Sequence, residues 1–226
     1  MRQIFARTSN VSSFVAAMER LQNKDGDLPG MALVFGEPGL GKTKTALWWA
    51  LQNGGVFIRT KKLMTGRWLL EEIVAELGES PAYRTSDLFR QAVEQLLSRP
   101  RTLLIDEVDY LAYDARVLET LRDIHDVAGT PMVFLGMDKA DKKLSRYRHL
   151  CDRFVEVVRF KPLSRDDVAS VAKQLCEVRL TGDAIDFIHA DADRFRQVLK
   201  WFYKAEARAR ANNLEEISAA NLKRKE

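Results

Sequence analysis

Residues 36–43 carry the feature that most constrains the fold, the run Gly-Glu-Pro-Gly-Leu-Gly-Lys-Thr. It matches the spacing G-x-x-x-x-G-K-[ST], in which glycines let backbone N–H groups turn inward around phosphates, Lys42 supplies charge and the Thr43 hydroxyl suits magnesium. An apolar run at residues 31–35 precedes it, and a helical pattern follows whose N-terminal end favours anions. We therefore predict a site for ATP and Mg²⁺ formed by Gly36, Glu37, Pro38, Gly39, Leu40, Gly41, Lys42, Thr43 and Lys44.

The buried-strand pattern at residues 102–105 is followed by two acidic residues, Asp106 and Glu107. An acidic residue at the end of a strand beside the glycine loop is suited to the magnesium shell, so Asp106 joins Thr43 as a predicted metal ligand. Glu107 is adjacent but outside that shell, which suits it to accept a proton from an attacking water as general base. The two residues predict Mg²⁺-dependent hydrolysis of ATP.

Apolar runs at residues 31–35, 56–58, 102–105 and 131–135 alternate with helical patterns at 43–52, 67–77, 85–97 and 114–127. Such alternation predicts an α/β fold with a parallel sheet sandwiched by helices. A helical pattern at 9–21 precedes them, with Ser9 or Asn10 as its expected N-cap, and a turn cluster occupies residues 24–30. Thr85 or Ser86 is the expected N-cap of the helix at 85–97.

The pattern changes at Pro162, after which every segment is helical in its spacing. Ser164 is placed to cap the first of these helices, with Asp166 and Asp167 in its first turn. We predict a nucleotide-binding domain over residues 1–162 and a small all-helical lid over residues 163–226.

Composition narrows the class of protein further. Of the 226 residues, 46% are apolar and 30% charged, which is typical of a globular protein, and the longest apolar runs are too short to span a membrane. Two cysteines without metal-ligand spacing fit a reducing compartment, so we expect a cytoplasmic protein without a membrane partner. The net charge of +4 permits contact with nucleic acid, and one basic cluster lies at the C-terminus, at residues 223–225.

With these motifs in place the chain resembles the AAA+ ATPases, through the segments GEPGLGKT and LLIDEVDYL. Within that family it looks most like the target-selection ATPases of bacterial transposons, the group that includes the transposition protein B of phage Mu. The later segments that carry this likeness are residues 120–137, 152–154 and 159–164. The chain departs from the family pattern at residues 136–138, Gly-Met-Asp, which offer no asparagine or threonine at the position of the usual polar sensor.

The resemblance implies two further catalytic arginines. An arginine shortly before the last strand reaches the ATP of a neighbouring subunit in such proteins, and Arg153 is similar in position, with Arg146 and Arg148 as substitutes. An arginine at the start of a lid helix contacts the γ-phosphate, which points to Arg196, with Arg194 in reserve. For Arg153 a local salt bridge is the alternative.

The resemblance also implies partners: double-stranded DNA bound without sequence preference, a transposase, and an ATP-dependent homo-oligomer or helical filament. We expect the basic segment after the second strand to contact DNA phosphates, through Arg59, Lys61, Lys62 and Arg67. The expected function is delivery of target DNA to a transposase. The alternatives are an AAA+ loader or initiator in DNA replication, a secretion-type AAA ATPase, and a non-oligomeric P-loop enzyme such as a small-molecule kinase.

Overall fold

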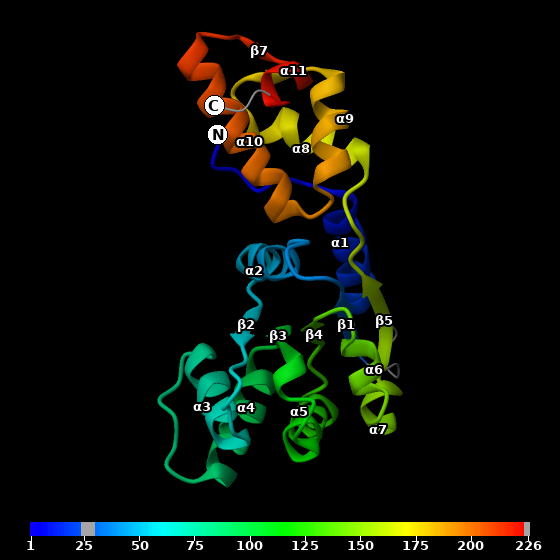
Figure 1. Ribbon diagram of the computed structural model, residues 1–226. Coiled ribbons are helices and arrows are strands. Elements are labelled where there is room, and N and C mark those ends of the chain that lie inside the picture. Colours follow the sequence, from blue (N-terminus) through cyan, green and yellow to red (C-terminus); the bar gives the residue numbers. More distant parts are fainter. Residues whose placement is uncertain (24–29, 224–226) are drawn as a thin grey trace. The chain divides into compact units, whose positions relative to one another are not determined.

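The computed structural model describes residues 1–23 and 30–223 (Figure 1). The predicted turn at residues 24–30, apart from Gly30, and the last two residues of the C-terminal basic cluster lie outside the described residues. The chain divides into two compact units. The larger unit comprises residues 14–37 and 42–160, and the smaller comprises residues 1–13, 38–41 and 161–226.

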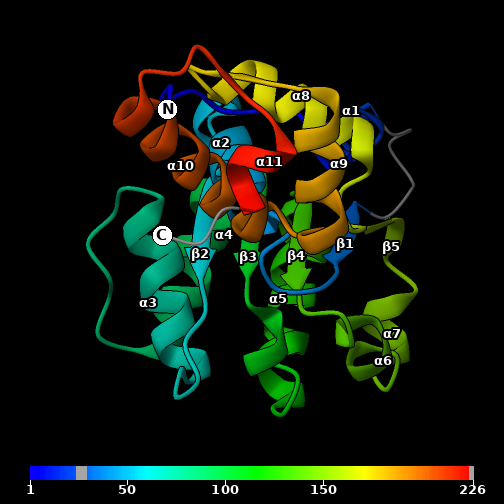
Figure 2. The same ribbon diagram turned by 45° about the horizontal axis from the view of Figure 1, so that its top comes forward.

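The larger unit contains a five-stranded parallel sheet in the order β2-β3-β4-β1-β5, and Figure 2 shows these strands side by side. The strands are β1 (Met31–Phe35), β2 (Val56–Arg59), β3 (Leu103–Asp106), β4 (Met132–Gly136) and β5 (Phe154–Arg159). Every residue of β1, β3 and β4 is buried, as expected for strands covered on both faces. The predicted parallel sheet is therefore confirmed.

Helices cover both faces of this sheet. In Figure 1, α3, α4 and α5 lie on one side of the strands and α2 lies on the other. The helices of this unit are α2 (Lys42–Asn53), α3 (Gly66–Glu76), α4 (Thr85–Ser98), the 3₁₀ turn η1 (Val108–Tyr110), α5 (Ala115–Ala128), α6 (Ala140–Leu144) and α7 (Arg148–Cys151). Because all strands are parallel, their carboxyl ends meet at one edge, where the loops after β1, β3 and β4 gather.

The smaller unit has its own apolar core, built around residues such as Val171, Ile188 and Phe202. Its elements are α8 (Arg165–Leu175), β6 (Arg179–Leu180), α9 (Gly182–Asp191), α10 (Phe195–Asn212), β7 (Glu216–Ile217) and α11 (Ala219–Lys223). The prediction of an all-helical lid is wrong in one respect, because β6 and β7 pair in parallel. Two residues per strand are too few to produce a strand periodicity in the sequence.

Helix α1 (Ser9–Gln22) begins in the smaller unit and ends in the larger one. Its predicted N-cap is corrected: the Thr8 side chain accepts a hydrogen bond from the Val11 N–H at 3.3 Å. The N–H and hydroxyl of Ser9 donate instead to the Asp167 carboxylate, each at 2.7 Å. Residues 1–13 thereby group with residues 161–226.

Two other capping predictions have different outcomes. The prediction for α4 is wrong, because its N-cap is Arg84, which makes no side-chain capping bond. The Ser164 cap of α8 is confirmed, since the Ser164 hydroxyl accepts from the Asp167 N–H and the Asp167 carboxylate accepts from the Ser164 N–H in a capping box.

Candidate nucleotide-binding site

The glycine loop leaves β1 through a backbone conformation that excludes side chains. Gly36 has a φ of 152°, and a Cβ atom there would lie 2.5 Å from the Phe160 carbonyl oxygen. The crowding follows from pairing, because the Phe160 N–H donates to the Phe35 carbonyl at 2.8 Å just beyond β5. Gly41 has a φ of 99°, also in the range that side chains disfavour. These positions therefore require glycine.

Lys42, the first residue of α2, turns its amine back toward the loop. Its Nζ donates to the Gly36 carbonyl at 2.6 Å and to the Glu37 carbonyl at 2.9 Å. Burial lowers the pKa of Lys42, and the carboxylates of the larger unit, Asp106 first, oppose that shift. The loop thus holds a half-buried amine.

Thr43 and Asp106 meet across the sheet edge. The Thr43 hydroxyl donates to Asp106 Oδ2 at 2.9 Å, and Asp106, the last residue of β3, is only 3% exposed. Burial raises the pKa of Asp106, while the hydrogen bond from Thr43 acts in the opposite direction. A hydroxyl and a carboxylate are the hard oxygen donors that Mg²⁺ prefers, so this pair fits a magnesium ion.

Glu107 follows Asp106 in a left-handed backbone conformation, with a φ of 59°. Such a conformation in a residue other than glycine costs about 1–3 kcal/mol and is common at functional sites. The Glu107 carboxylate contacts the Arg59 guanidinium, and Arg59 Nε lies 3.1 Å from Glu107 Oε1. A hydrogen bond with Glu107 also raises the pKa of Tyr110. The candidate general base is therefore held by a cation from the neighbouring strand.

Arg59 reaches this position through the register of the sheet. It is the last residue of β2 and lies directly beside Asp106 in the β2–β3 pairing. The sequence pattern suggested only a DNA contact for Arg59. Its contact with Glu107 depends on which strands are neighbours, which the local sequence does not reveal.

Asp109 is a third acidic residue of this segment, and it is buried. Its carboxylate accepts from the Met137 N–H at 2.6 Å and pairs with Lys143 at 2.9 Å. These contacts tie η1 to the segment after β4, the place where the expected polar sensor is absent. Nearby, Asp138 pairs with Arg159 at 3.1 Å. Asp109 therefore has a structural role.

In the smaller unit, Arg194 and Arg196 lie beside residues 38–41 of the glycine loop. The Arg196 N–H donates to the Gly39 carbonyl at 3.1 Å. Arg194 is the N-cap residue of α10, and Arg196 is in its first turn. The helix start chosen from the sequence is thus next to the loop within this unit.

Arg153 makes the local salt bridge that was the alternative to a catalytic role. Its guanidinium binds the Asp126 carboxylate through two hydrogen bonds, at 2.8 and 2.6 Å. It also donates to the His149 carbonyl at 2.6 Å. In this conformation the Arg153 guanidinium forms hydrogen bonds within its own chain.

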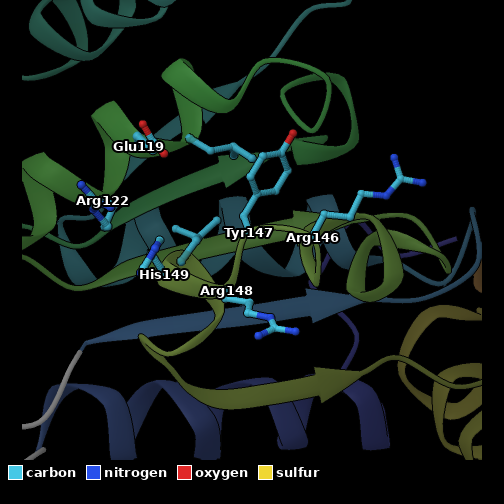
Figure 3. Close-up of a pocket in the computed structure, with 8 residues that line it drawn as sticks. Glu119, Arg122, Arg146, Tyr147, Arg148 and His149 are labelled. Atoms are coloured by element: carbon cyan, nitrogen blue, oxygen red, sulfur yellow. The ribbon is translucent and has the colours of Figure 1, made fainter.

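The substitutes Arg146 and Arg148 line an open pocket of about 270 Å³ between α5 and α7. Figure 3 shows their side chains extending in different directions, with Arg122 across the pocket on α5. Within residues 1–23 and 30–223, neither Arg146 nor Arg148 forms an ion pair. Arg122 pairs with Asp123 at 2.6 Å. The two arginines are free to contact another molecule, but they do not converge on one ligand in the pocket.

The other predicted DNA contacts lie between β2 and the start of α3. Lys61 pairs with Glu72 at 2.6 Å, and Arg67 pairs with Glu71 at 2.8 Å. Lys62 is exposed and has no carboxylate partner among the described residues. These cations therefore share one exposed segment, although two of them are engaged within the chain.

Three features define the P-loop class of nucleotide-binding proteins: a glycine loop between β1 and α2, a parallel sheet, and a buried aspartate at the end of a strand. Here that aspartate is Asp106, which accepts a hydrogen bond from the Thr43 hydroxyl. The chain belongs to the AAA domain family, whose profile matches residues 25–144, more than half of its length. It is accordingly an ATP-binding AAA+ protein. Within that family it resembles the phage Mu type of target DNA activator, as the following relatives indicate.

Among curated relatives, the "ATP-dependent target DNA activator B" of Escherichia phage D108 is 28% identical over 151 residues, and that of Escherichia phage Mu is 27% identical. Each match covers 63% of this chain and 48% of the phage protein. A Staphylococcus aureus "Potential ATP-binding protein" is 34% identical over 42% of this chain and 31% of its own. The chain thus matches less than half the length of these relatives.

Solved structures share the fold. The Aeropyrum pernix ORC2 protein superimposes with a TM-score of 0.73 at 14% identity, covering 98% of this chain and 69% of its own. Cdc6p from Pyrobaculum aerophilum gives a TM-score of 0.63 at 20% identity, covering 92% of this chain and 62% of its own. None of the described helices is long and apolar enough to cross a membrane.

Proposed function

We propose that this chain is a Mg²⁺-dependent ATPase that binds duplex DNA and delivers it to a transposase. The observation that carries the ATPase part is the Thr43–Asp106 hydrogen bond, with Glu107 next in the chain and strained into a left-handed conformation. The DNA part is supported by the phage relatives, whose names describe activators of target DNA.

In the proposed site, the backbone of residues 36–44 surrounds the phosphates, Lys42 supplies charge to the outer phosphates, and Thr43 and Asp106 hold magnesium. Magnesium, when bound, neutralises charge that develops on the phosphate oxygens. The hydrogen bond between Thr43 and Asp106 brings two oxygen donors to the same place. The raised pKa of Asp106 reflects the cost of burying this carboxylate, which a cation nearby would offset.

Glu107 is the proposed general base. It accepts a proton from a water molecule whose oxygen bonds to the γ-phosphorus, while the bond to the bridging oxygen breaks and ADP leaves with that electron pair. Before it can do so, the Glu107 carboxylate must leave the Arg59 guanidinium. Hydrolysis is therefore slow as long as the Arg59–Glu107 pair persists.

Two arginines are proposed to complete the site. Arg196, beside Gly39 in the smaller unit, contacts the γ-phosphate, with Arg194 in reserve. Arg153 acts on the ATP of a neighbouring subunit, which requires it to exchange Asp126 for phosphate on assembly. Arg146 and Arg148 are the substitutes if it does not. Residues 163–226 act in this scheme as the lid of a domain formed by residues 1–162.

DNA contact is assigned to Lys61, Lys62 and Arg67, together with Arg59 when it is released from Glu107. These side chains bind phosphates and carry no base-reading pattern, so the expected binding is independent of sequence. Assembly as a homo-oligomer or filament would repeat this group of phosphate-binding side chains along the duplex.

A replication loader or initiator is the second candidate, favoured by the fold shared with the Aeropyrum and Pyrobaculum proteins. Both candidates bind duplex DNA with ATP. They differ in the client protein, because only the first stimulates strand transfer by a transposase into the DNA that it has bound.

Duplex binding measured by fluorescence anisotropy over a range of salt concentrations tests the DNA assignment. We expect the protein to bind duplex DNA in the presence of ATP. The double variant Lys61→Ala, Lys62→Ala should bind more weakly, and by the same factor on unrelated sequences. The slope of log binding constant against log salt concentration should become shallower by about 0.9 for each lost phosphate contact. Arg90→Ala, which removes an exposed cation paired on α4, is the matched control. An unchanged salt slope in the double variant would contradict this DNA surface.

A further inference from the structure

The segment after β2 forms a tight turn with an apolar tip. The Met64 N–H donates to the Lys61 carbonyl at 2.9 Å, which leaves Lys62 and Leu63 at the outer corner of the turn. Leu63 is 83% exposed, whereas the next residue, Met64, is buried in the core. The turn therefore displays one leucine side chain to solvent.

Both ends of this turn are anchored. On one side Thr60 is buried, and its hydroxyl donates to the Asp106 carbonyl at 3.0 Å and to the Glu107 carbonyl at 2.8 Å. On the other side the Thr65 side chain caps α3 by accepting from the Trp68 N–H at 3.2 Å. These bonds hold the residues on both sides of the turn that carries Leu63.

The charges around Leu63 distinguish it from other exposed apolar residues. Single exposed apolar side chains are common and need no explanation. Leu51 on α2, for example, is 74% exposed and is followed by Gln52 and Asn53. Leu63, in contrast, follows two exposed lysines, Lys61 and Lys62, and stands four residues before Arg67 in the first turn of α3. Minor-groove proteins combine basic side chains with an apolar wedge that enters between base pairs, and Leu63 with its neighbouring cations offers both.

We propose that Leu63 is a wedge that inserts between adjacent base pairs from the minor groove and locally unstacks and kinks the bound duplex. Lys61 and Lys62 hold the phosphates beside the wedge. This inference rests on the proposed DNA-binding function and adds to it a deformation of the DNA. Sequences that unstack easily, such as pyrimidine–purine steps, are the ones at which insertion costs least.

Duplexes carrying 2-aminopurine at single positions test the wedge, because this base fluoresces more strongly when it is unstacked. The full chain is bound to them with a non-hydrolysable ATP analogue. We expect fluorescence to rise on binding of the unaltered protein and of Leu63→Met, and the rise to be lost in Leu63→Ala. Leu63→Ala should bind about tenfold more weakly, equivalent to ~1.4 kcal/mol. Its salt slope should be unchanged, since no phosphate contact is removed.

Leu51→Ala is the matched control, since it removes another largely exposed leucine, one followed in the sequence by the uncharged Gln52 and Asn53, and it should retain the fluorescence rise. A duplex bound with no rise in fluorescence, or an equal rise with Leu63→Ala, would overturn the wedge and leave the proposed DNA-binding function intact. Failure of the unaltered protein to bind duplex DNA with any nucleotide would overturn the proposed function, and the wedge with it.

Discussion

Replacing Arg59 with alanine removes the cation that holds the Glu107 carboxylate. If Glu107 is the general base, hydrolysis requires it to leave Arg59, so the stability of this ion pair adds to the activation barrier. Arg59→Ala should therefore raise ATP hydrolysis in the absence of DNA. The same change removes one candidate phosphate contact and should weaken DNA binding slightly.

The size of the effect follows from the exposure of the pair. The Arg59 side chain is 61% exposed and that of Glu107 is 22% exposed, so water and salt screen their attraction. Ion pairs of this kind contribute about 0.2–1 kcal/mol. At about 1.36 kcal/mol for each factor of ten, the predicted gain in rate is about 1.4- to 5-fold.

The assay is steady-state phosphate release at saturating ATP without DNA. Arg20→Ala is the control, because Arg20 is 59% exposed and binds Glu156 on the edge strand β5 through two hydrogen bonds of 2.7 Å. It should leave the rate unchanged. A rate for Arg59→Ala equal to or below that of the unaltered protein would refute the idea that Arg59 restrains the base.

Three other variants test the site. Lys42→Ala should abolish nucleotide binding, whereas Glu107→Gln should bind ATP and not hydrolyse it; ATP affinity and phosphate release together separate the two. Asp106→Asn should abolish hydrolysis but raise the free energy of unfolding, since it removes a buried charge. Because the pKa of Asp106 is raised in the folded protein, this gain is present at neutral pH, shrinks as the pH falls below that raised pKa and is gone below the carboxyl's ordinary value, which thermal melts across pH can check. Arg153→Ala should cost at most about 1 kcal/mol through loss of the half-exposed Asp126 pair. It should nevertheless remove the ATPase stimulation that accompanies assembly, and mixing it with Glu107→Gln should restore some activity; no rescue in mixed assemblies would exclude Arg153 from the neighbour's site.

The local parts of the fold were predictable from the sequence. Strand β1 and residues 103–105 of β3 are continuous apolar runs, so their composition alone predicts burial on both faces. The glycine loop is equally local, because glycine at positions 36 and 41 is required by backbone conformations that other residues disfavour. The edge strand β5 gave a weaker signal, since Val155 and Val157 are exposed and Glu156 lies between them.

The contacts that complete the site depend on neighbours distant in sequence. Arg59 meets Glu107 only because β2 pairs with β3 in one register. Lys143 meets Asp109 because α6 follows β4 at the same sheet edge. Arg153, chosen by resemblance, binds Asp126 on α5, a partner that no local pattern indicates. The candidate residues could therefore be found from the sequence. The ion pairs that restrain them could be found only from the structure, because they join residues that are distant in the sequence.

The proposed function requires ATP binding to control assembly of this chain on duplex DNA. Electron microscopy of the Glu107→Gln protein with duplex DNA and either ATP or ADP tests it most directly, since this variant should keep ATP bound. We predict regular assemblies along the duplex with ATP and none with ADP. Lone protomers on DNA with ATP, or the same assemblies with both nucleotides, would show that ATP binding does not control assembly.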